Sequence, residues 1–187
     1  HLLLERQDER WRERYPLATA EDEQLIERMV ASWAGSALAA RVGSLEGAQL
    51  ELPFAFEIDG VLIRGRFDLY HRGDDGAALV VDYKTNRLGE LSPDELVERS
   101  YRHQVAIYAL AALLGGARTV EVAYAFLDGP DAVAVRTFDA GDADALRDGI
   151  RASLGPILEG RFEARPGAWC ADCPALDVLC AGPALPG

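Results

Sequence analysis

The chain has 187 residues, enough for one domain with a sizeable core, and its 49% hydrophobic and 27% charged residues are an ordinary globular mixture. It contains no apolar run of about 18 residues, which argues against a membrane-spanning helix, and its charged N-terminus does not resemble a secretion signal. The net charge of −12 argues mildly against a nucleic-acid partner, although an acidic domain can carry a local basic channel.

The N-terminal region is predicted to be helical. Residues 1–14 read as a charged helix, and because the chain opens on His1 rather than Met we expect it to be part of a longer protein. A second helix is predicted from Glu21 to Arg41, since its apolar residues recur at helical spacing. These are Leu25, Ile26, Met29, Val30 and Trp33.

The pattern then changes to that of β-strands. Residues 50–58, 61–71 and 78–84 are each predicted to form a strand. Asp59-Gly60 is a strong two-residue hairpin turn, because both central positions of such a turn need a positive φ. A second turn is expected at 74–76, so the three strands should form an antiparallel meander.

A helix, two strands and a last helix are predicted to follow. Ser92 to Glu95 form a capping box with proline at the first helical position, and Gly115-Gly116 end the helix. Strands are expected over 119–127 and 132–138, and a helix over 142–158. This order predicts an α/β class with a mixed central sheet flanked by helices.

The domain organisation that we expect is a single domain over residues 1–187. It would comprise N-terminal helices in 1–42, a core in 48–158 and a cysteine-containing tail in 159–187.

The informative polar residues lie in the second and third strands. Alternation places Val61, Ile63, Phe67 and Leu69 on one face of the second strand, and Arg64, Arg66 and Asp68 on the other. On the third strand Asp82 and Lys84 are two apart and share a face. An aspartate within an apolar strand needs a cation or a metal as its partner, and Asp68 on the neighbouring strand can approach the same spot.

Two interpretations of this group stay open. The carboxylates could hold Mg²⁺, with Lys84 acting on the attacking water or on the phosphate. Alternatively, Asp82 and Lys84 form a surface ion pair on a half-exposed strand, because the D-x-K spacing is common by chance.

The motifs of this region resemble a known family. GRFD (65–68) followed by VVDYKTN (80–86) is similar to the core of PD-(D/E)XK nucleases, especially the RecB and AddAB-type nuclease domains. The resemblance implies a restriction-endonuclease-like fold in which Asp68 and Asp82 bind Mg²⁺ or Mn²⁺ and Lys84 is catalytic. It also implies that the backbone carbonyl of Tyr83 is a further metal ligand.

Two further motifs extend the resemblance. The family's Q-x-x-x-Y motif matches Gln104 and Tyr108, which lie on one helical face, although core packing is the alternative for Tyr108. The family's metal-binding histidine, in a context like H-x-x-L-E, matches His1, although chance or a tag remnant would also explain it.

The three cysteines, Cys170, Cys173 and Cys180, lie close together near the C-terminus. Their tight spacing and odd number favour metal ligation over a disulfide framework, and hence a cytoplasmic protein. In some members of the family three such cysteines hold a [4Fe–4S] cluster, whose fourth ligand this chain lacks. Zinc, or thiols that merely pack as small apolar residues, are the alternatives.

The function implied by the resemblance is a metal-dependent DNA exonuclease domain that acts on linear single- or double-stranded ends in double-strand-break repair and recombination. No P-loop is present, so a helicase motor would lie upstream in the parent chain or in a partner subunit. The alternatives are a catalytically inactive scaffold that binds DNA or a partner subunit, and a thiol-based metal or redox protein.

Overall fold

The structure is a computed structural model that describes residues 19–161, 166–167, 170, 173, 175–176, 178 and 180. The chain divides into two compact units, His1–Arg151 and Ala152–Gly187, and the boundary falls within helix α7 (Ala143–Leu158). The helix predicted over residues 1–14 lies outside the described residues, and the expectation of a single domain over 1–187 stays a prediction. Within the described part of the chain, no helix is both long and apolar enough to cross a membrane.

The N-terminal region differs from its prediction. The single helix expected from Glu21 to Arg41 is wrong, because the chain forms α3 (Ala20–Ala34) and α4 (Ala37–Gly43). Gly35 ends α3, and the Ser36 side chain then accepts a hydrogen bond from the backbone N–H of Ala39 and caps α4. A serine in this position favours a new helix start over continuation of the first helix.

The predicted antiparallel meander is confirmed. Strand β1 (Gln49–Ile58) pairs with β2 (Val61–Arg72), which in turn pairs with β3 (Ala77–Lys84). Asp59 and Gly60 have φ values of 50° and 82°, as the predicted turn requires.

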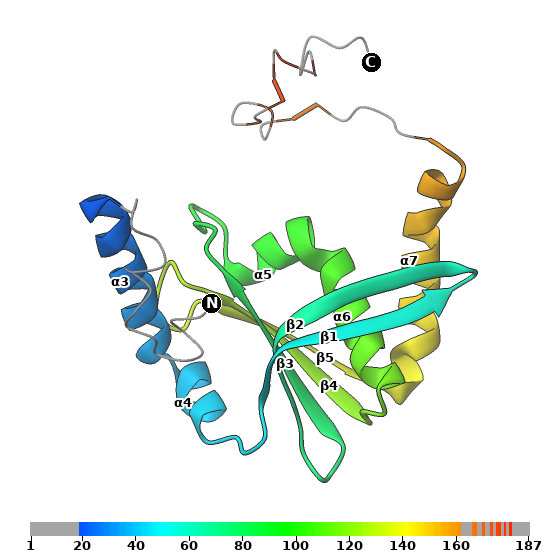
Figure 1. Cartoon of the computed structure of the whole chain (residues 1–187), viewed down its shortest axis with the longest axis horizontal. Helices are drawn as coiled ribbons and strands as arrows, with labels where there is room; N and C mark the ends of the chain where they lie inside the picture. The colour runs from blue at the N-terminus through cyan, green and yellow to red at the C-terminus, as the bar shows by residue number, and fades with distance from the viewer. Residues whose placement is uncertain are drawn as a thin grey trace. The chain divides into compact units, whose positions relative to one another are not determined.

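The second half of the chain completes a mixed sheet. Its elements are α5 (Pro93–Leu96), the π-helical turn η1 (Val97–Tyr101), α6 (Arg102–Leu114), β4 (Thr119–Phe126), β5 (Val133–Asp139) and the 3₁₀ turn η2 (Ala140–Asp142) before α7. The five strands follow one another in chain order across the sheet, and only β3 and β4 are parallel (Figure 1). The capping box at Ser92 and Glu95 is confirmed, but η1 interrupts the helix expected to follow it.

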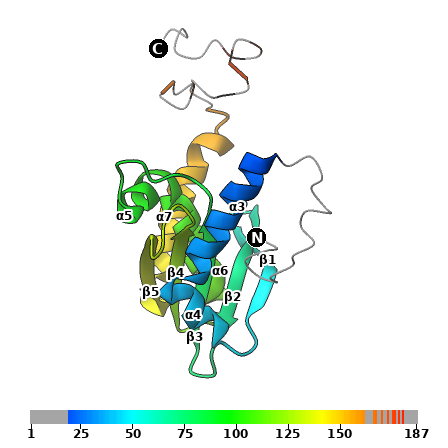
Figure 2. The same ribbon diagram turned by 90° about the vertical axis from the view of Figure 1, so that its left-hand side faces the viewer.

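Helices cover both faces of the sheet. On one face α6 packs against strand residues that include Val80, Val122 and Tyr124. On the other face lie α3 and α4 (Figure 2). They contribute Trp33 and Leu38 to a second apolar cluster. Alternate residues of β3 therefore point into two different cores. Its neighbouring strands, β2 and β4, cover its two edges.

Strand β2 does not keep the regular alternation that its sequence predicts. Phe67 and Leu69 were expected on one face, but Phe67 packs in the α6 cluster and Leu69 in the α3 cluster. The irregularity lies between them, because the ladder to β1 pairs Phe67 with Leu52 and Leu69 with Leu50 and passes over Asp68. Glu51, the residue that would face it, has a φ of 53°. This left-handed conformation lies opposite the point where β2 changes the face to which its side chains point.

Candidate active site

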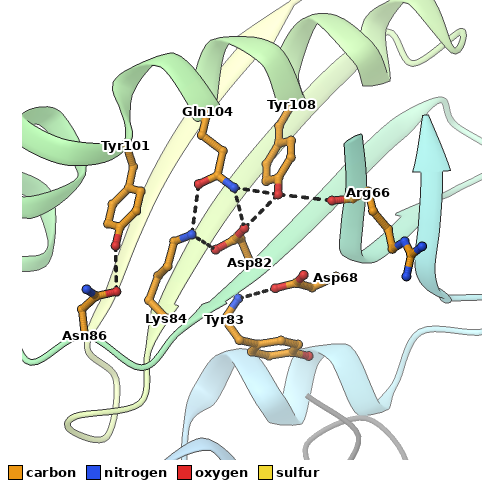
Figure 3. A network of polar contacts seen from close by, with 9 residues as sticks. All are labelled: Arg66, Asp68, Asp82, Tyr83, Lys84, Asn86, Tyr101, Gln104 and Tyr108. Atoms are coloured by element: carbon orange, nitrogen blue, oxygen red, sulfur yellow. Dashed lines mark hydrogen bonds and ion pairs between the residues drawn. The ribbon is translucent and has the colours of Figure 1, made fainter. Parts of the chain in front are cut away.

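Asp82 lies near the C-terminal end of β3, the central strand of the sheet, and only 3% of its surface is exposed. A buried carboxylate is costly unless charges or hydrogen bonds compensate it. The Nζ atom of Lys84 lies 2.7 Å from Asp82 Oδ2, as an ion pair without hydrogen-bond alignment. Gln104 Nε2 and Tyr108 Oη lie 3.1 and 2.9 Å from the other oxygen, Oδ1 (Figure 3). The predicted strand and helix residues thus meet around one carboxylate.

Gln104 joins the cation to the anion. Its Oε1 accepts a hydrogen bond from Lys84 Nζ at 3.0 Å, while its Nε2 donates to Asp82 and to Tyr108 Oη at 2.8 Å. The amide is therefore oriented with its oxygen toward the ammonium group and its nitrogen toward the carboxylate. These contacts use the donors and acceptor that a buried amide must satisfy.

Tyr108 is a neutral donor in this network. Burial, followed by the negative charge of Asp82, raises the pKa of Tyr108 above its usual range. Its hydroxyl accepts from Gln104 and has Asp82 Oδ1 and the Arg66 carbonyl oxygen, at 3.2 Å, as acceptors. Core packing, the alternative for this residue, also holds, because the ring contacts Phe54 and Phe67 edge-on.

Asp68 lies beside the network at the point where the ladder between β2 and β3 ends. The last paired residues there are Leu69 and Val81, and the backbone N–H of Tyr83 then donates to Asp68 Oδ2 at 2.9 Å. Burial raises the pKa of Asp68 to about 6, more strongly than the Tyr83 hydrogen bond lowers it, and the nearby Asp82 charge adds to the increase. Burial therefore disfavours the charged form of this carboxylate.

The donor set fits a hard divalent cation. Two carboxylates, Asp68 and Asp82, lie at the same end of the sheet beside the Lys84 ammonium group, and the pKa of Asp68 is raised mainly by burial and further by the charge of Asp82. Carboxylate and carbonyl oxygens are the ligands that Mg²⁺ prefers. No group of three or more His, Cys, Asp or Glu side chains converges within the part of the chain that is described. His1 lies outside the described residues.

Lys84 is the only lysine of this sequence, which otherwise contains 18 arginines and three histidines as basic residues. Its side chain is 14% exposed, so the ammonium group lies at the boundary between the protein interior and solvent. Arginine carries a planar fork of donors and cannot replace the compact ammonium charge. The interpretation of Asp82 and Lys84 as a surface ion pair is wrong, because Asp82 is buried.

Three residues around Lys84 received no role from the sequence, although Asn86 is the last residue of the VVDYKTN motif. Tyr101 and Tyr124 place their rings beneath its ammonium group, and Asn86 accepts a hydrogen bond from the Tyr101 hydroxyl. The only sequence signal for Tyr101 is its position three residues before Gln104, on the same helical face. Tyr124 lies in an apolar strand that reads as plain core.

Gly65, the glycine of the G-x-x-D motif, has a packing reason. A Cβ atom at this position would lie 2.4 Å from Phe54 Cζ on the paired strand β1. The Phe54 ring is itself held by Phe67, with ring centroids 4.6 Å apart, and cannot easily yield. The motif glycine therefore lets an aromatic ring cover the strand that carries Asp68.

The three cysteines belong to the second unit, in which the described residues are few. Cys170 is half-buried, Cys173 and Cys180 are exposed, and none of them forms a disulfide. The Sγ atom of Cys170 accepts a backbone N–H from Gly167 at 3.4 Å. Ligation of a [4Fe–4S] cluster or zinc by these thiols stays a prediction.

Comparison with known proteins places this geometry in context. The family model described as the PD-(D/E)XK nuclease superfamily matches residues 1–180. One relative, an ATP-dependent helicase/nuclease subunit from Lachnoclostridium phytofermentans, is 43% identical over 70 residues. That match covers 36% of this chain and 5% of the relative, so the chain corresponds to a small part of that protein's length.

Two solved structures are similar in fold. The crystal structure of a candidate exonuclease from Eubacterium rectale has a TM-score of 0.50 and 14% identity, covering 87% of this chain and 65% of that chain. The crystal structure of SSO0001 has a TM-score of 0.48 and 21% identity, covering 92% of this chain and 81% of that chain. At this level of identity the likeness to the first structure concerns the fold alone.

Proposed function

The chain belongs to the PD-(D/E)XK nuclease superfamily, and from this premise we propose that it is a Mg²⁺-dependent deoxyribonuclease domain that hydrolyses phosphodiester bonds. The observation that carries the proposal is the buried carboxylate of Asp82, which Lys84, Gln104 and Tyr108 surround beside a second carboxylate, Asp68. A purely structural core gains nothing from two acids and one lysine at the same end of a sheet.

Each residue has a role in this proposal. Gln104 and Tyr108 hold the Asp82 carboxylate in one orientation through its Oδ1 atom. Asp68 and Asp82, with the Tyr83 carbonyl oxygen, would hold the metal. Mg²⁺ bound there supplies an activated water molecule and offsets charge on the scissile phosphate.

Lys84 acts directly on the reacting groups. An ammonium group has three N–H donors, and within the described residues Lys84 donates one hydrogen bond, to Gln104, and forms one ion pair, with Asp82. A donor therefore remains for the attacking water or for a non-bridging phosphate oxygen. Charge that develops on the phosphate would be stabilised by this fixed positive group.

We infer that the domain works as an exonuclease within a larger helicase–nuclease. The similarity to a helicase/nuclease protein supports this, and the match covers only 5% of that protein's length. The motor, upstream in the parent chain or in a partner subunit, would then deliver linear DNA to the site. Repair of double-strand breaks and recombination are the processes that need such resection of DNA ends.

The test is degradation of end-labelled linear DNA, single- and double-stranded, with Mg²⁺, Mn²⁺ or EDTA. Wild type should degrade DNA only with a metal, and Lys84→Ala should lose this activity. Arg41→Ala is the matched control, because it removes one positive charge from α4, where Arg41 pairs with Glu121 away from the site. Equal cleavage by wild type and Lys84→Ala would refute the site.

A catalytically inactive scaffold that binds DNA or a partner subunit is the second candidate. The net charge of −12 favours it, as does the finding that both oxygens of Asp82 already have protein partners. Calorimetric titration with Mn²⁺ separates the two candidates. Binding that disappears in an Asp68→Asn/Asp82→Asn double variant supports the nuclease, and no binding by wild type supports the scaffold.

A further inference from the structure

Two aromatic rings line the position of the Lys84 ammonium group. Its Nζ atom lies 4.3 Å from the ring centroid of Tyr101 and 5.3 Å from that of Tyr124. The two rings stack on each other, with centroids 5.6 Å apart and an interplanar angle of 25°. A cation at such distances from an aromatic face is attracted by the ring's quadrupole. The rings therefore form a support for the charge.

The Tyr101 ring is itself fixed from several sides. Its hydroxyl donates to Asn86 Oδ1 at 2.7 Å, and Asn86 lies two residues after Lys84 in the chain (Figure 3). Burial, followed by the charge of Asp82, raises the pKa of Tyr101, which keeps the hydroxyl a donor. Beneath the ring, Tyr124 is fully buried and forms part of the core.

The helix geometry aligns Tyr101 with the rest of the site. Tyr101, Gln104 and Tyr108 have the spacing i, i+3 and i+7, which places them along one face of a helix. Tyr101 ends the π-helical turn Val97–Tyr101 that joins α5 to α6. Such turns are rare and are often found at functional sites. The turn lies between the capped start of the helical segment, at Ser92, and α6, which carries Gln104 and Tyr108.

We propose that Tyr101 is a positioning residue, which together with Asn86 and Tyr124 clamps the Lys84 side chain so that its Nζ atom stays between Asp82 and the substrate phosphate. A lysine side chain has four flexible methylene groups and would otherwise sample many rotamers. The clamp holds one of them without occupying the remaining N–H donor. The catalytic consequence rests on the proposed function, whereas the clamp itself does not.

The single lysine of the chain allows the clamp to be observed directly. Protein labelled with ¹³C at lysine Cε gives one side-chain resonance, that of Lys84. Because the methylene next to Nζ lies near two ring faces, ring currents should displace its ¹H shift upfield from the value for free lysine. Tyr101→Leu should move the resonance toward the free value, while Tyr101→Phe, which keeps the ring but loses the hydrogen bond to Asn86, should give an intermediate shift.

Matched variants separate the clamp from general packing effects. Phe56→Leu makes the same kind of change on β1, in a partly buried ring outside the clamp, and should leave the resonance in place. Asn86→Ala, at an exposed position, removes only the hydrogen bond and should give an intermediate shift even if Tyr101→Leu does not fold. Because Tyr101→Leu also removes the ring current itself, an unmoved resonance in both Tyr101→Phe and Asn86→Ala, which keep the ring, would overturn the proposal.

Kinetics then connect the clamp to catalysis. Misplacement of a reacting group by about 1 Å can cost on the order of 100-fold in rate, so we expect kcat to fall about 10- to 100-fold in Tyr101→Leu with KM nearly unchanged. Tyr101→Phe should retain most of the activity. A shifted resonance without any nuclease activity in wild type would uphold the clamp and reject the proposed function. A fall in kcat in Asn86→Ala with an unmoved resonance would reject the clamp and leave the function standing.

Discussion

The two faces of β3 solve the same problem of burial in different ways. Toward α3 the strand presents Val81 and Tyr83, and the ring of Tyr83 meets Trp33 edge-on with centroids 4.9 Å apart. Toward α6 it presents Asp82 and Lys84, which no apolar partner could satisfy. The α3 face is stabilised by close apolar packing, whereas the α6 face is stable only when the ion pair and the hydrogen bonds of Asp82 are all formed. Substitutions on the two faces should therefore separate stability from activity.

The largest effect is expected from Asp82→Ala. It removes the carboxylate that compensates Lys84 and leaves a poorly solvated ammonium group, which costs about 3–5 kcal/mol in the free energy of unfolding. Nuclease activity should fall by more than about 100-fold. Denaturant unfolding and DNA degradation measure the two effects.

Asp82→Asn is the control, because it keeps the shape and loses the charge. We expect it to be as inactive as Asp82→Ala while unfolding at a higher denaturant concentration. Unchanged stability in Asp82→Ala would contradict the distinction between the faces.

Trp33→Ala should have the opposite balance. Trp33 is 8% exposed, and loss of its ring leaves a cavity against Tyr83, which costs about 3 kcal/mol of stability. Activity per folded molecule should stay within a factor of a few of wild type. The measurement is cleavage at low temperature, scaled by the folded fraction from circular dichroism. A loss as large as that of Asp82→Asn would show that the α3 face takes part in catalysis.

Gly65→Ala should have a medium effect, at the boundary between packing and site. The added methyl group must displace the Phe54 ring, for which we expect a cost of about 1–3 kcal/mol. In a protein that already carries Phe54→Leu, Gly65→Ala should cost less stability than it does in wild type. A double-mutant cycle of unfolding free energies can measure this difference. Strict additivity of the two changes would contradict the steric explanation.

Asp68→Asn should have the smallest effect on the free energy of unfolding, and in metal-free protein it should stabilise rather than destabilise. The pKa of Asp68 is about 6 in the folded protein, against 3.8 ordinarily, so folding favours its protonated form. Its charge therefore costs stability fully above about pH 6, and this cost disappears below about pH 4. Because the group is partly exposed, we expect Asn to stabilise by only about 1 kcal/mol at pH 7.

Metal should reverse this order of stability. Mg²⁺ or Mn²⁺ should raise the melting temperature of wild type and leave that of Asp68→Asn nearly unchanged. Thermal melts at pH 4 and pH 7, with and without metal, check both expectations. A stabilising effect of Asn at pH 4 as large as at pH 7 would contradict the role of the charge.

The sequence predicted the strands to within one or two residues, because alternation and the Asp59-Gly60 turn are local signals. It also predicted the members of the network around Asp82, through the resemblance of their motifs. The break at Gly35-Ser36 was missed because helical spacing continues through it, although Ser36 is a strong cap. The facing of Phe67 and Leu69 could not be predicted, since it depends on a left-handed residue, Glu51, on the neighbouring strand.

The clamp around Lys84 escaped prediction for a physical reason. Tyr124 becomes a neighbour of Lys84 only because β4 aligns in parallel with β3, which places Tyr124 beside Asp82. No periodicity within β4 indicates that its tyrosine lies under a cation rather than in a plain core. Contacts between parallel strands that a helix connects, such as that of Tyr124 with Lys84, can be identified only from the three-dimensional structure.

The position of α6 as the connection between β3 and β4 has a consequence for how the protein folds. The contacts that join Lys84 to Gln104, Asp82 to Gln104 and Asp82 to Tyr108 close loops of 20, 22 and 26 residues. Loops of this length have a modest closure entropy, and contacts of low sequence separation form quickly. We therefore expect the polar network to assemble as soon as the strand–helix–strand unit collapses, after the more local β1–β2 hairpin has formed.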